Sequence, residues 1–313
     1  MSSRTSFGLL ATAVALLLAG GCSRDLDPLG LAPFPSEALI FGDGFADGVN
    51  FQAFAGSKVD AVQIDQVERY QGAASLRVTV PAPADPSGSY AGGAFVANVP
   101  RDLTGYNALT FWAKASIPAA LDVAGLGNDN TGTSLYTAQA GGLALTTSWA
   151  RYVIPIPDAS FLDQEAGLFF FAEGAEAGQA YTLWFDEVQF ESVGGLGSPR
   201  PALDIQTLGL EVGATATVSG TRVTFSVGGS DITVSAAPSY FTYTSSNEAV
   251  ATVSAAGTIT MVGEGTATIT AALGSVPAEG SVVVTTASGP AEAAPTPTRD
   301  AADVISLFSD AYT

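Results

Sequence analysis

Short runs of alternating apolar and polar residues fill the chain between Leu39 and Phe190, and Gly, Pro, Asn and Asp separate them. A repeat of two residues is typical of strands that have one buried face. No segment here keeps the 3.6-residue repeat of a helix. We therefore expect residues 38–193 to form a two-sheet β-sandwich, with its clearest strands at Ser75–Val80, Leu109–Lys114, Arg151–Ile154 and Leu183–Asp186.

The alternation also predicts which side chains leave the core. In the run 109–114 the odd-numbered residues share one face, so Trp112 and Lys114 lie opposite the core. In the run 151–156 the even-numbered residues point inward, which leaves Arg151 on the outer or concave face. Trp112 could offer an exposed ring there or pack under a loop or between the sheets, and both readings stay open.

Other aromatic residues are assigned from their neighbours. Trp149 and Trp184 flank apolar runs and are expected in the core. Asn128 opens a polar loop that could, together with Tyr136, rim the same cleft as Trp112. The candidate ligand-binding residues are therefore Trp112, Lys114, Arg151, Asn128 and Tyr136.

The rest of the chain divides into further segments. Residues 194–201 are rich in Gly and Pro and predict a linker. Residues 202–286, rich in Val and Thr with alternating faces, predict a second, smaller β domain. Residues 287–300 are a Pro-rich linker. Residues 301–313 contain Leu307-Phe308-Ser309-Asp310-Ala311-Tyr312, which repeats the pattern of residues 40–45 and predicts the start of a second, truncated module.

The N-terminal residues predict how the protein is targeted in the cell. Residues 1–21 combine Arg4, an apolar stretch at 7–18 and small residues before Cys22, as in a signal peptide with a short helix. A stretch of about 12 apolar residues is too short to span a bilayer. Residues 18–22 resemble the lipobox of bacterial lipoproteins, with Ala19 in place of Leu or Val. An ordinary signal peptide followed by an incidental cysteine is the alternative.

The lipobox resemblance implies that Cys22, the only cysteine, carries the lipid and that residues 22–37 form a tether. Several acyl chains on one residue anchor a protein firmly. Ser23 resembles outer-membrane rather than inner-membrane sorting. The expected partner of Cys22 is thus outer-membrane lipid, and the expected location is the outer membrane or cell surface of a Gram-negative bacterium.

Charge and composition exclude several functions. The chain of 313 residues has 30 acidic and 11 basic residues, a net charge of −19. Nucleic-acid binding needs Lys and Arg to neutralise phosphates, so it is excluded. The chain has no histidine, which excludes Ser-His-Asp and Cys-His catalysis. In the run 186–191, Asp186 and Glu187 are neighbours on opposite faces of a strand, which does not suit a glycosidase pair. We expect no enzyme in this segment.

The second β domain resembles a known family. Residues 243–259, with their Ser-Ser-Asn and Val-x-x-x-Gly turn, lead to Gly265-Thr266-Ala267-Thr268-Ile269. This pattern is similar to the bacterial immunoglobulin-like domain, group 2, which also occurs in adhesins. The family usually has Trp where Tyr243 stands, and that aromatic residue is a core plug. The resemblance implies an Ig-like sandwich that serves as a spacer.

The first domain resembles the jelly-roll, galactose-binding-like modules of polysaccharide-degrading enzymes. The resemblance is carried by residues 70–78, 109–114, 149–157 and 183–188. Beside a group 2 Ig-like domain, such a module is similar to the non-catalytic front of family 16 glycoside hydrolases of the laminarinase type. The resemblance implies an all-β fold, a jelly roll followed by an Ig-like sandwich, and a polysaccharide such as a β-glucan as ligand.

Jelly rolls of this type often hold a structural calcium ion that ties the first strand to the last. Matched to that pattern, Asp43 is the first-strand acid and Asp186 the last-strand acid, and Glu68 and the Gln71 carbonyl come from the loop before Gly72. Carboxylate and carbonyl oxygens are the ligands that Ca²⁺ prefers. Unrelated surface acids are the alternative.

The sequence therefore predicts a non-catalytic surface lipoprotein region that binds polysaccharide through its jelly roll. An adhesin or structural stalk without a sugar site is the first alternative. The second is an accessory region of a family 16 glycoside hydrolase whose catalytic domain lies beyond residue 313.

Overall fold

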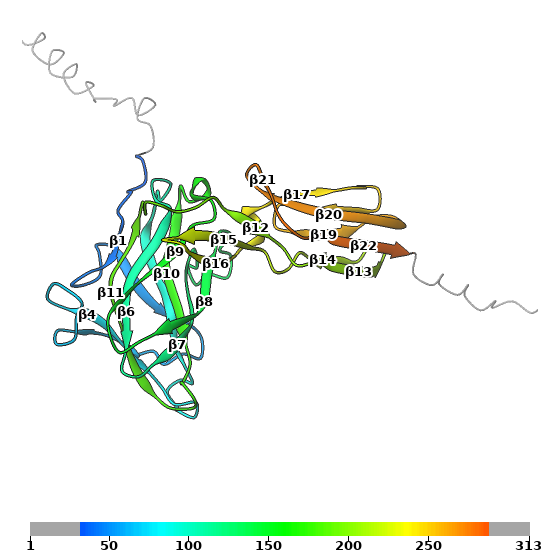
Figure 1. The fold of residues 1–313 in the computed structure, drawn as a ribbon. Coiled ribbons are helices and arrows are strands. Elements are labelled where there is room, and N and C mark those ends of the chain that lie inside the picture. Colours follow the sequence, from blue (N-terminus) through cyan, green and yellow to red (C-terminus); the bar gives the residue numbers. More distant parts are fainter. Residues whose placement is uncertain (1–31, 288–313) are drawn as a thin grey trace, which may run out of the picture. The chain divides into compact units, whose positions relative to one another are not determined.

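A computed structural model describes residues 32–287, and these residues form strands joined by turns and two short 3-10 helices (Figure 1). The two sandwiches belong to one unit that begins at Phe34. The predicted signal peptide 1–21, the lipidation site Cys22, the module start at 301–313 and all but one residue of the linker 287–300 lie outside the described residues. Within residues 32–287, no helix has the length and apolar character needed to cross a bilayer.

The first sandwich contains the elements β1 (Leu39–Phe41), β2 (Val49–Ala53), β3 (Val62–Asp65), β4 (Ser75–Val80), β5 (Ala91–Arg101), β6 (Ala108–Ala115), β7 (Ala119–Leu126), β8 (Ala138–Leu145), β9 (Ala150–Pro155), η1 (Ala159–Phe161), β10 (Glu165–Glu173) and β11 (Tyr181–Glu191). All four strands that the alternation predicts are present. The fold class is all-β, as expected, with a jelly roll followed by an Ig-like sandwich.

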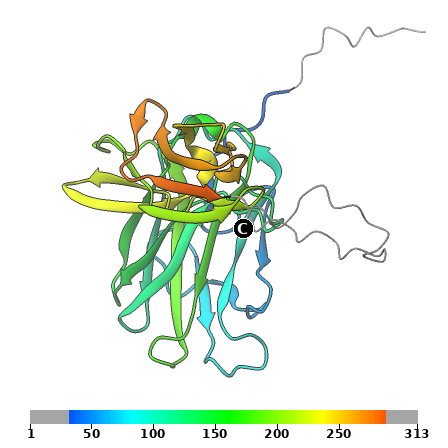
Figure 2. The same cartoon turned by 90° about the vertical axis from the view of Figure 1, so that its right-hand side faces the viewer.

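Two sheets face each other in the jelly roll (Figures 1 and 2). One, here called the front sheet, has the order β3-β4-β11-β6-β9, and β1 also pairs with β11. The other, the back sheet, contains β8-β7-β10-β5-β2. Because β11 pairs with β1, β4 and β6, the last strand of the domain holds the front sheet together.

Aromatic rings fill the space between the sheets. Phe111 and Phe185 point inward from the front sheet, and Phe169 and Phe171 point inward from the back sheet, all at 0% exposure. The ring centroids of Phe169 and Phe185 are 5.4 Å apart. Tyr152 stacks on Phe111 at 5.4 Å, which confirms the inward face predicted for the run 151–156. Burying such rings contributes on the order of 2 kcal/mol each.

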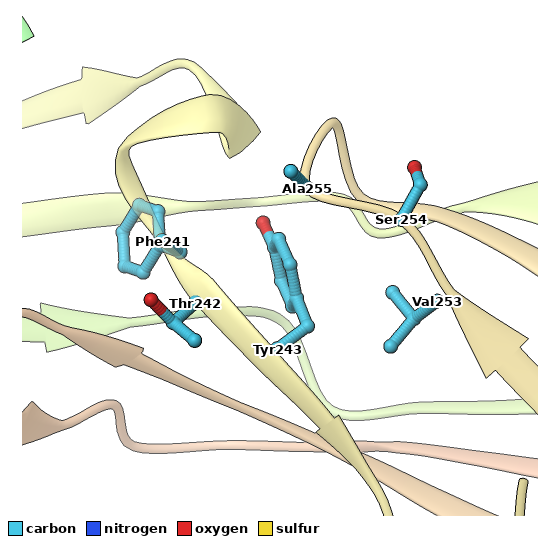
Figure 3. A pocket seen from close by; sticks show the side chains of 6 residues that line it. All are labelled: Phe241, Thr242, Tyr243, Val253, Ser254 and Ala255. Carbon is cyan, nitrogen blue, oxygen red and sulfur yellow. The ribbon is translucent and has the colours of Figure 1, made fainter.

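The second sandwich contains β12 (Arg200–Ala202), β13 (Gln206–Glu211), β14 (Thr215–Thr217), β15 (Arg222–Val227), β16 (Ser230–Ala236), η2 (Pro238–Tyr240), β17 (Thr242–Ser245), β18 (Ala251–Val253), β19 (Thr258–Met261), β20 (Gly265–Leu273), β21 (Val276–Pro277) and β22 (Val282–Ala287). One sheet has the order β13-β22-β20-β17, with β21 beside β20, and the other β14-β19-β18. A cavity of about 220 Å³ opens beside Tyr243 (Figure 3).

The hairpin β15–β16 does not join either of these sheets. Strand β16 pairs with β8 through Ser235↔Gln139 and Ala236↔Ala138, so the hairpin and β12 extend the back sheet of the jelly roll. Next to this seam the Tyr240 hydroxyl, on a side chain that is 1% exposed, donates to the carbonyl of Tyr136 at 2.9 Å. Backbone hydrogen bonds and a buried ring therefore connect the two sandwiches.

Candidate functional site

All three tryptophans of the chain gather at the outer face of the front sheet. Trp112 comes from β6 and Trp184 from β11, on the side opposite the core rings. Trp149 stands just before β9, on the turn that Thr146 and Ser148 close with a hydrogen bond of 2.9 Å. All three side chains are half-buried. The expectation that Trp149 and Trp184 lie in the core is wrong, because apolar neighbours do not fix the side of the sheet that a ring occupies.

The loop between β3 and β4, residues 66–74, lies over this face. Its Tyr70 stacks on Trp112 with ring centroids 3.7 Å apart and an interplanar angle of 11°. The Trp149 ring meets Tyr70 edge-on at 6.2 Å and 61°. Trp112 is thus packed under a loop, one of the two readings of the sequence, whereas Tyr70 keeps 38% of its surface exposed. The exposed aromatic surface is a corner with Tyr70 and Trp149 as its sides.

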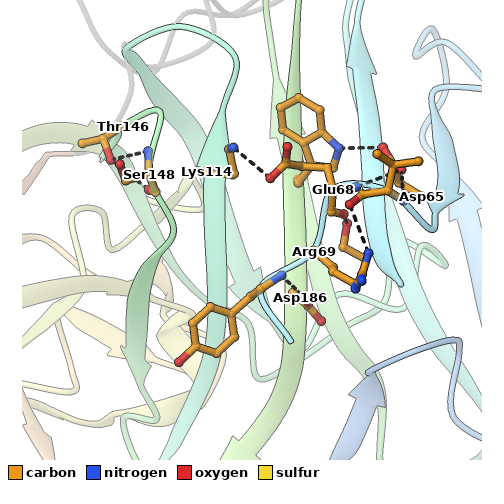
Figure 4. Close-up of polar contacts among 11 residues, drawn as sticks. Asp65, Glu68, Arg69, Lys114, Thr146, Ser148 and Asp186 are labelled. Carbon is orange, nitrogen blue, oxygen red and sulfur yellow. Dashed lines mark hydrogen bonds and ion pairs between the residues drawn. The ribbon is translucent and has the colours of Figure 1, made fainter. Parts of the chain in front are cut away.

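Backbone hydrogen bonds to two carboxylates hold the loop in place. Asp186, at 0% exposure, accepts a hydrogen bond through Oδ2 from the amide of Tyr70 at 2.8 Å (Figure 4). The same oxygen accepts from the amide of Gln71 at 3.3 Å. Asp43 accepts from the amides of Ala73 and Ala74. Burial raises the pKa of Asp186, and the hydrogen bonds from the amides of Tyr70 and Gln71 oppose that rise. The loop is therefore tied to the last strand and to the chain just after β1.

Gly72 permits the close approach of the loop to Asp43. It has a φ of +65°, and a Cβ added there would overlap the Asp43 carboxylate. Glycine adopts this left-handed conformation at little cost, whereas other residues resist it. The position of Tyr70 over Trp112 thus depends on a glycine two residues further on.

The predicted calcium ligands Asp43, Glu68, Gln71 and Asp186 all border this loop, and several of their carboxylate oxygens have partners within the protein. Both Asp186 oxygens accept from backbone amides, one from Glu187 at 2.8 Å, and Glu68 Oε1 contacts Lys114 Nζ at 3.0 Å. Among residues 32–287, no group of three or more Asp, Glu, His or Cys side chains is placed to hold a metal ion. The calcium site stays a prediction.

Two cations on the front face, Lys114 and Arg151, are each paired with a carboxylate. Lys114 lies 3.0 Å from Glu68 (Figure 4) and 5.4 Å from the centre of the Trp184 ring, within the range of a cation–π contact. Arg151 Nη2 lies 2.7 Å from Glu191 Oε2. Both cations were predicted to face away from the core, and the structure places them there.

A second acid anchors the other side of the face. The indole Nε1 of Trp184 donates to Asp65 Oδ2 at 3.0 Å. This hydrogen bond is the main cause that lowers the pKa of Asp65. Since Asp65 also accepts from the amides of Val67 and Glu68, it fixes both the Trp184 ring and the start of the loop.

The structure does not bring Asn128 and Tyr136 to this face. Both lie between β7 and β8, strands of the back sheet. Tyr136 stacks on Phe161 at 4.9 Å and meets Tyr240 at 5.3 Å, so its ring belongs to the seam between the sandwiches. Asn128 accepts from the Asn130 amide at 2.9 Å within its own loop. The polar sequence of the loop does not show which of the two sheets these residues lie next to.

Tyr70 was missed as a candidate from sequence. A strand run reveals its faces by alternation, but a loop has no such repeat. The available signal was local, because Tyr70 stands two residues before a glycine in a loop that links two predicted strands. An aromatic residue held near such a turn is a candidate for ligand contact.

Residues 210–285 match the bacterial Ig-like domain (group 2) family. The match lies inside the predicted second domain and confirms the resemblance read from residues 243–269. It includes β15 and β16, which extend the back sheet of the jelly roll. No curated protein matches the chain.

Solved structures similar to this chain include carbohydrate-binding modules. A family 30 module of a cellulosomal cellulase of Clostridium thermocellum is 17% identical, covers 52% of this chain and 96% of its own, and has a TM-score of 0.35. A family 11 module from Clostridium thermocellum, in complex with a β-1,3-1,4-mixed-linked tetrasaccharide, is 12% identical over 50% of this chain and 97% of its own, with a TM-score of 0.36.

A longer match is a β-1,2-glucanase from Parabacteroides distasonis, 14% identical over 82% of this chain and 39% of its own, with a TM-score of 0.33. With TM-scores below 0.5, none of these likenesses decides a ligand, which has to be argued from the residues.

Proposed function

We propose that this chain binds polysaccharide at the front face of its jelly roll. The observation that carries the proposal is the aromatic corner of Tyr70 and Trp149, backed by Trp112 and rimmed by Lys114 and Arg151. Aromatic faces stack on the apolar faces of sugar rings, while charged and amide groups take the hydroxyls. A partly exposed Tyr beside a Trp edge, among fixed polar groups, suits that ligand.

The corner fits a single chain of sugars better than a flat crystalline surface. A flat surface needs rings in one plane, and the planes of Tyr70 and Trp149 are inclined at 61°. One sugar ring can stack on Tyr70 with its edge against Trp149. The resemblance to the laminarinase-type proteins makes a β-glucan the first glycan to test.

Other parts of the protein have proposed roles beside the sugar-binding face. Cys22 is the proposed lipid anchor in an outer membrane, and the Ig-like sandwich is the proposed spacer. The parent protein could carry a family 16 catalytic domain. The described part has no histidine, and Asp186 is buried with both carboxylate oxygens accepting hydrogen bonds from backbone amides. We propose no catalytic role for it.

Retention of the full chain on insoluble polysaccharides tests the binding proposal. A β-1,3-glucan, a mixed-linkage β-1,3-1,4-glucan and a xylan are suitable probes. Retention on one of them that Tyr70→Ala removes supports the proposed face. A folded protein that no polysaccharide retains would favour the surface stalk.

Calcium is tested separately, by melting the protein with Ca²⁺ and with a chelator. A metal that ties Asp43 to Asp186 would raise the Tm, and Asp186→Asn would abolish the rise. An unchanged Tm would mean that the amide hydrogen bonds alone hold the loop.

A further inference from the structure

We propose that two ion pairs on the front face, Arg151–Glu191 and Lys114–Glu68, close it to acidic polysaccharides and limit its ligand to a neutral glycan. This inference rests on the proposed function, because it concerns the same face. It assigns Glu191 and Glu68 as residues that set specificity. Each of them neutralises a cation that an acidic sugar would otherwise use.

Glu191 is fixed by three neighbours. Its Oε2 accepts from Arg151 at 2.7 Å, and its Oε1 accepts from Thr110 Oγ1 at 2.6 Å and from Gln189 Nε2 at 3.2 Å. With both oxygens engaged, the carboxylate cannot swing away when an anion approaches Arg151. A uronate or sulfate that reached Arg151 would therefore lie beside a second negative charge, which repels it.

Glu68 shields Lys114 from solvent anions because the Glu68 side chain is the more exposed of the two. The Lys114 side chain is 16% exposed and the Glu68 side chain 39%. An incoming anion thus meets the carboxylate before the ammonium. The Lys114 ammonium also lies near the Trp184 ring, so leaving Glu68 for a ligand would change two contacts at once.

The other cations of this part of the described chain are engaged as well. Arg69 donates to the carbonyls of Gln66, Val67 and Gly72. Arg77 donates to Gln63 on the neighbouring strand β3. These partners are neutral, so Arg69 and Arg77 keep their charge, and the barrier against an anion lies at the two carboxylates Glu191 and Glu68. The net charge of −19 repels an acidic polysaccharide over longer distances.

A neutral sugar meets no such barrier. Its hydroxyls donate to carboxylate and amide oxygens and accept from Arg and Lys, so an ion pair can serve it without being broken. The same two pairs that exclude an anion therefore offer donors and acceptors to a neutral chain that stacks on Tyr70.

The test compares each neutral polysaccharide with its own carboxymethylated derivative, which keeps the same backbone and linkages and adds carboxylate groups, and the salt dependence separates the effect of their charge from that of their size. The full chain is run by affinity electrophoresis against a mixed-linkage β-glucan, a β-1,3-glucan, a xylan and their carboxymethylated forms, at 20 and 500 mM NaCl. At low salt we expect at least tenfold weaker binding to the charged form. At 500 mM NaCl the difference in affinity between the neutral and the charged form should become smaller, because salt screens the repulsion between the protein and the carboxylates of the polysaccharide.

The variant Glu191→Gln tests whether removing the carboxylate allows the protein to bind the charged polysaccharide. The amide keeps an acceptor for Thr110 but leaves Arg151 without its counter-charge, so binding to the carboxymethylated form should rise at least fivefold relative to the neutral form. Glu211→Gln, an exposed substitution on β13 of the other sandwich, is the matched control and should leave this ratio unchanged.

Three outcomes overturn the inference in distinguishable ways. Wild-type protein that binds the charged form as well as the neutral form would refute the exclusion. A Glu191→Gln variant with an unchanged ratio would refute the role of Glu191. Absence of binding to every probe by the folded chain would overturn the proposed function, and the inference with it.

Discussion

Replacing Glu173 by Gln should remove one buried group whose deprotonation lowers the stability of the fold as the pH rises from acid to neutral. Glu173 ends β10 and is 2% exposed. Its carboxyl accepts from the Tyr181 hydroxyl and, at 2.6 Å, from the Asp122 amide. Burial raises its pKa from 4.5 to about 7, against the lowering effect of those two hydrogen bonds.

The direction and the size of this change in stability follow from the difference between the pKa of Glu173 in the folded protein and in the unfolded chain. Because the folded-state pKa lies above the unfolded value, the folded protein holds a proton between pH 4.5 and 7 that the unfolded chain has lost. This contribution to stability is complete below pH 4.5 and is lost as the pH rises through 7. The slope is about 1.4 kcal/mol per pH unit, so the shift corresponds to about 3 kcal/mol in all.

Glutamine keeps the geometry without the titration. Its amide nitrogen can donate to the Tyr181 oxygen, and its carbonyl can accept from the Asp122 amide. We therefore expect Glu173→Gln to match wild type at pH 4.5 and to be more stable by about 3 kcal/mol at pH 8.5. Urea unfolding followed by tryptophan fluorescence at five pH values between these limits measures the difference.

The control is Glu211→Gln on the exposed face of β13, which should follow the wild-type pH curve. Parallel curves for wild type and Glu173→Gln would refute the reasoning, because they would mean that the buried carboxyl binds no extra proton in the folded state. A Glu173→Gln variant that is less stable at every pH would show that the carboxylate itself is needed.

Two further changes test how the site and the seam are built. Gly72→Ala should destabilise the protein by about 1–3 kcal/mol, because φ at Gly72 is +65° and the new Cβ would overlap Asp43. Gly44→Ala is the control and should be tolerated, because nothing lies within 4 Å of a Cβ at that position. Equal melting temperatures for the two variants would contradict this reasoning. Tyr240→Phe removes the hydrogen bond to the Tyr136 carbonyl and should lower the free energy of unfolding by about 1 kcal/mol. Urea unfolding measures it, and an unchanged value would mean that the bond contributes nothing.

Much of the jelly roll could be predicted from sequence because its strands alternate cleanly. Once Phe111 is placed in the core, the two-residue repeat places Trp112 and Lys114 outside it. The same rule places Tyr152 inside and Arg151 outside. The Ig-like domain was predicted from its motifs, and the family match confirms it.

The site itself could be predicted only in part, because loops carry no repeat. Tyr70 reaches Trp112 through a loop whose path depends on Asp186, which is 116 residues further along the chain than Tyr70. Tyr136 was assigned to the wrong neighbourhood, because nothing in its loop shows that Tyr240 will cover it. Long-range packing of this kind is set by the whole fold and not by the local pattern.

The seam at β8 was also beyond the reach of the sequence. Residues 222–236 alternate as strands of the second domain should, but alternation does not identify the partner strand. The pairing of Ser235 with Gln139 places this hairpin on the jelly-roll sheet. Binding assays on this protein are therefore best made with both sandwiches present.

The most direct test of the proposed binding face is the retention of wild type, Tyr70→Ala and Phe161→Ala on the insoluble polysaccharide that wild type binds best. Tyr70→Ala removes the ring but keeps the amide that Asp186 holds. Phe161 is 39% exposed against 38% for Tyr70 and lies by the seam, so it is the matched control.

We expect at least tenfold weaker retention for Tyr70→Ala, the size expected for a central aromatic contact, and wild-type retention for Phe161→Ala. Equal retention of wild type and Tyr70→Ala would contradict the placement of the sugar site on the front face.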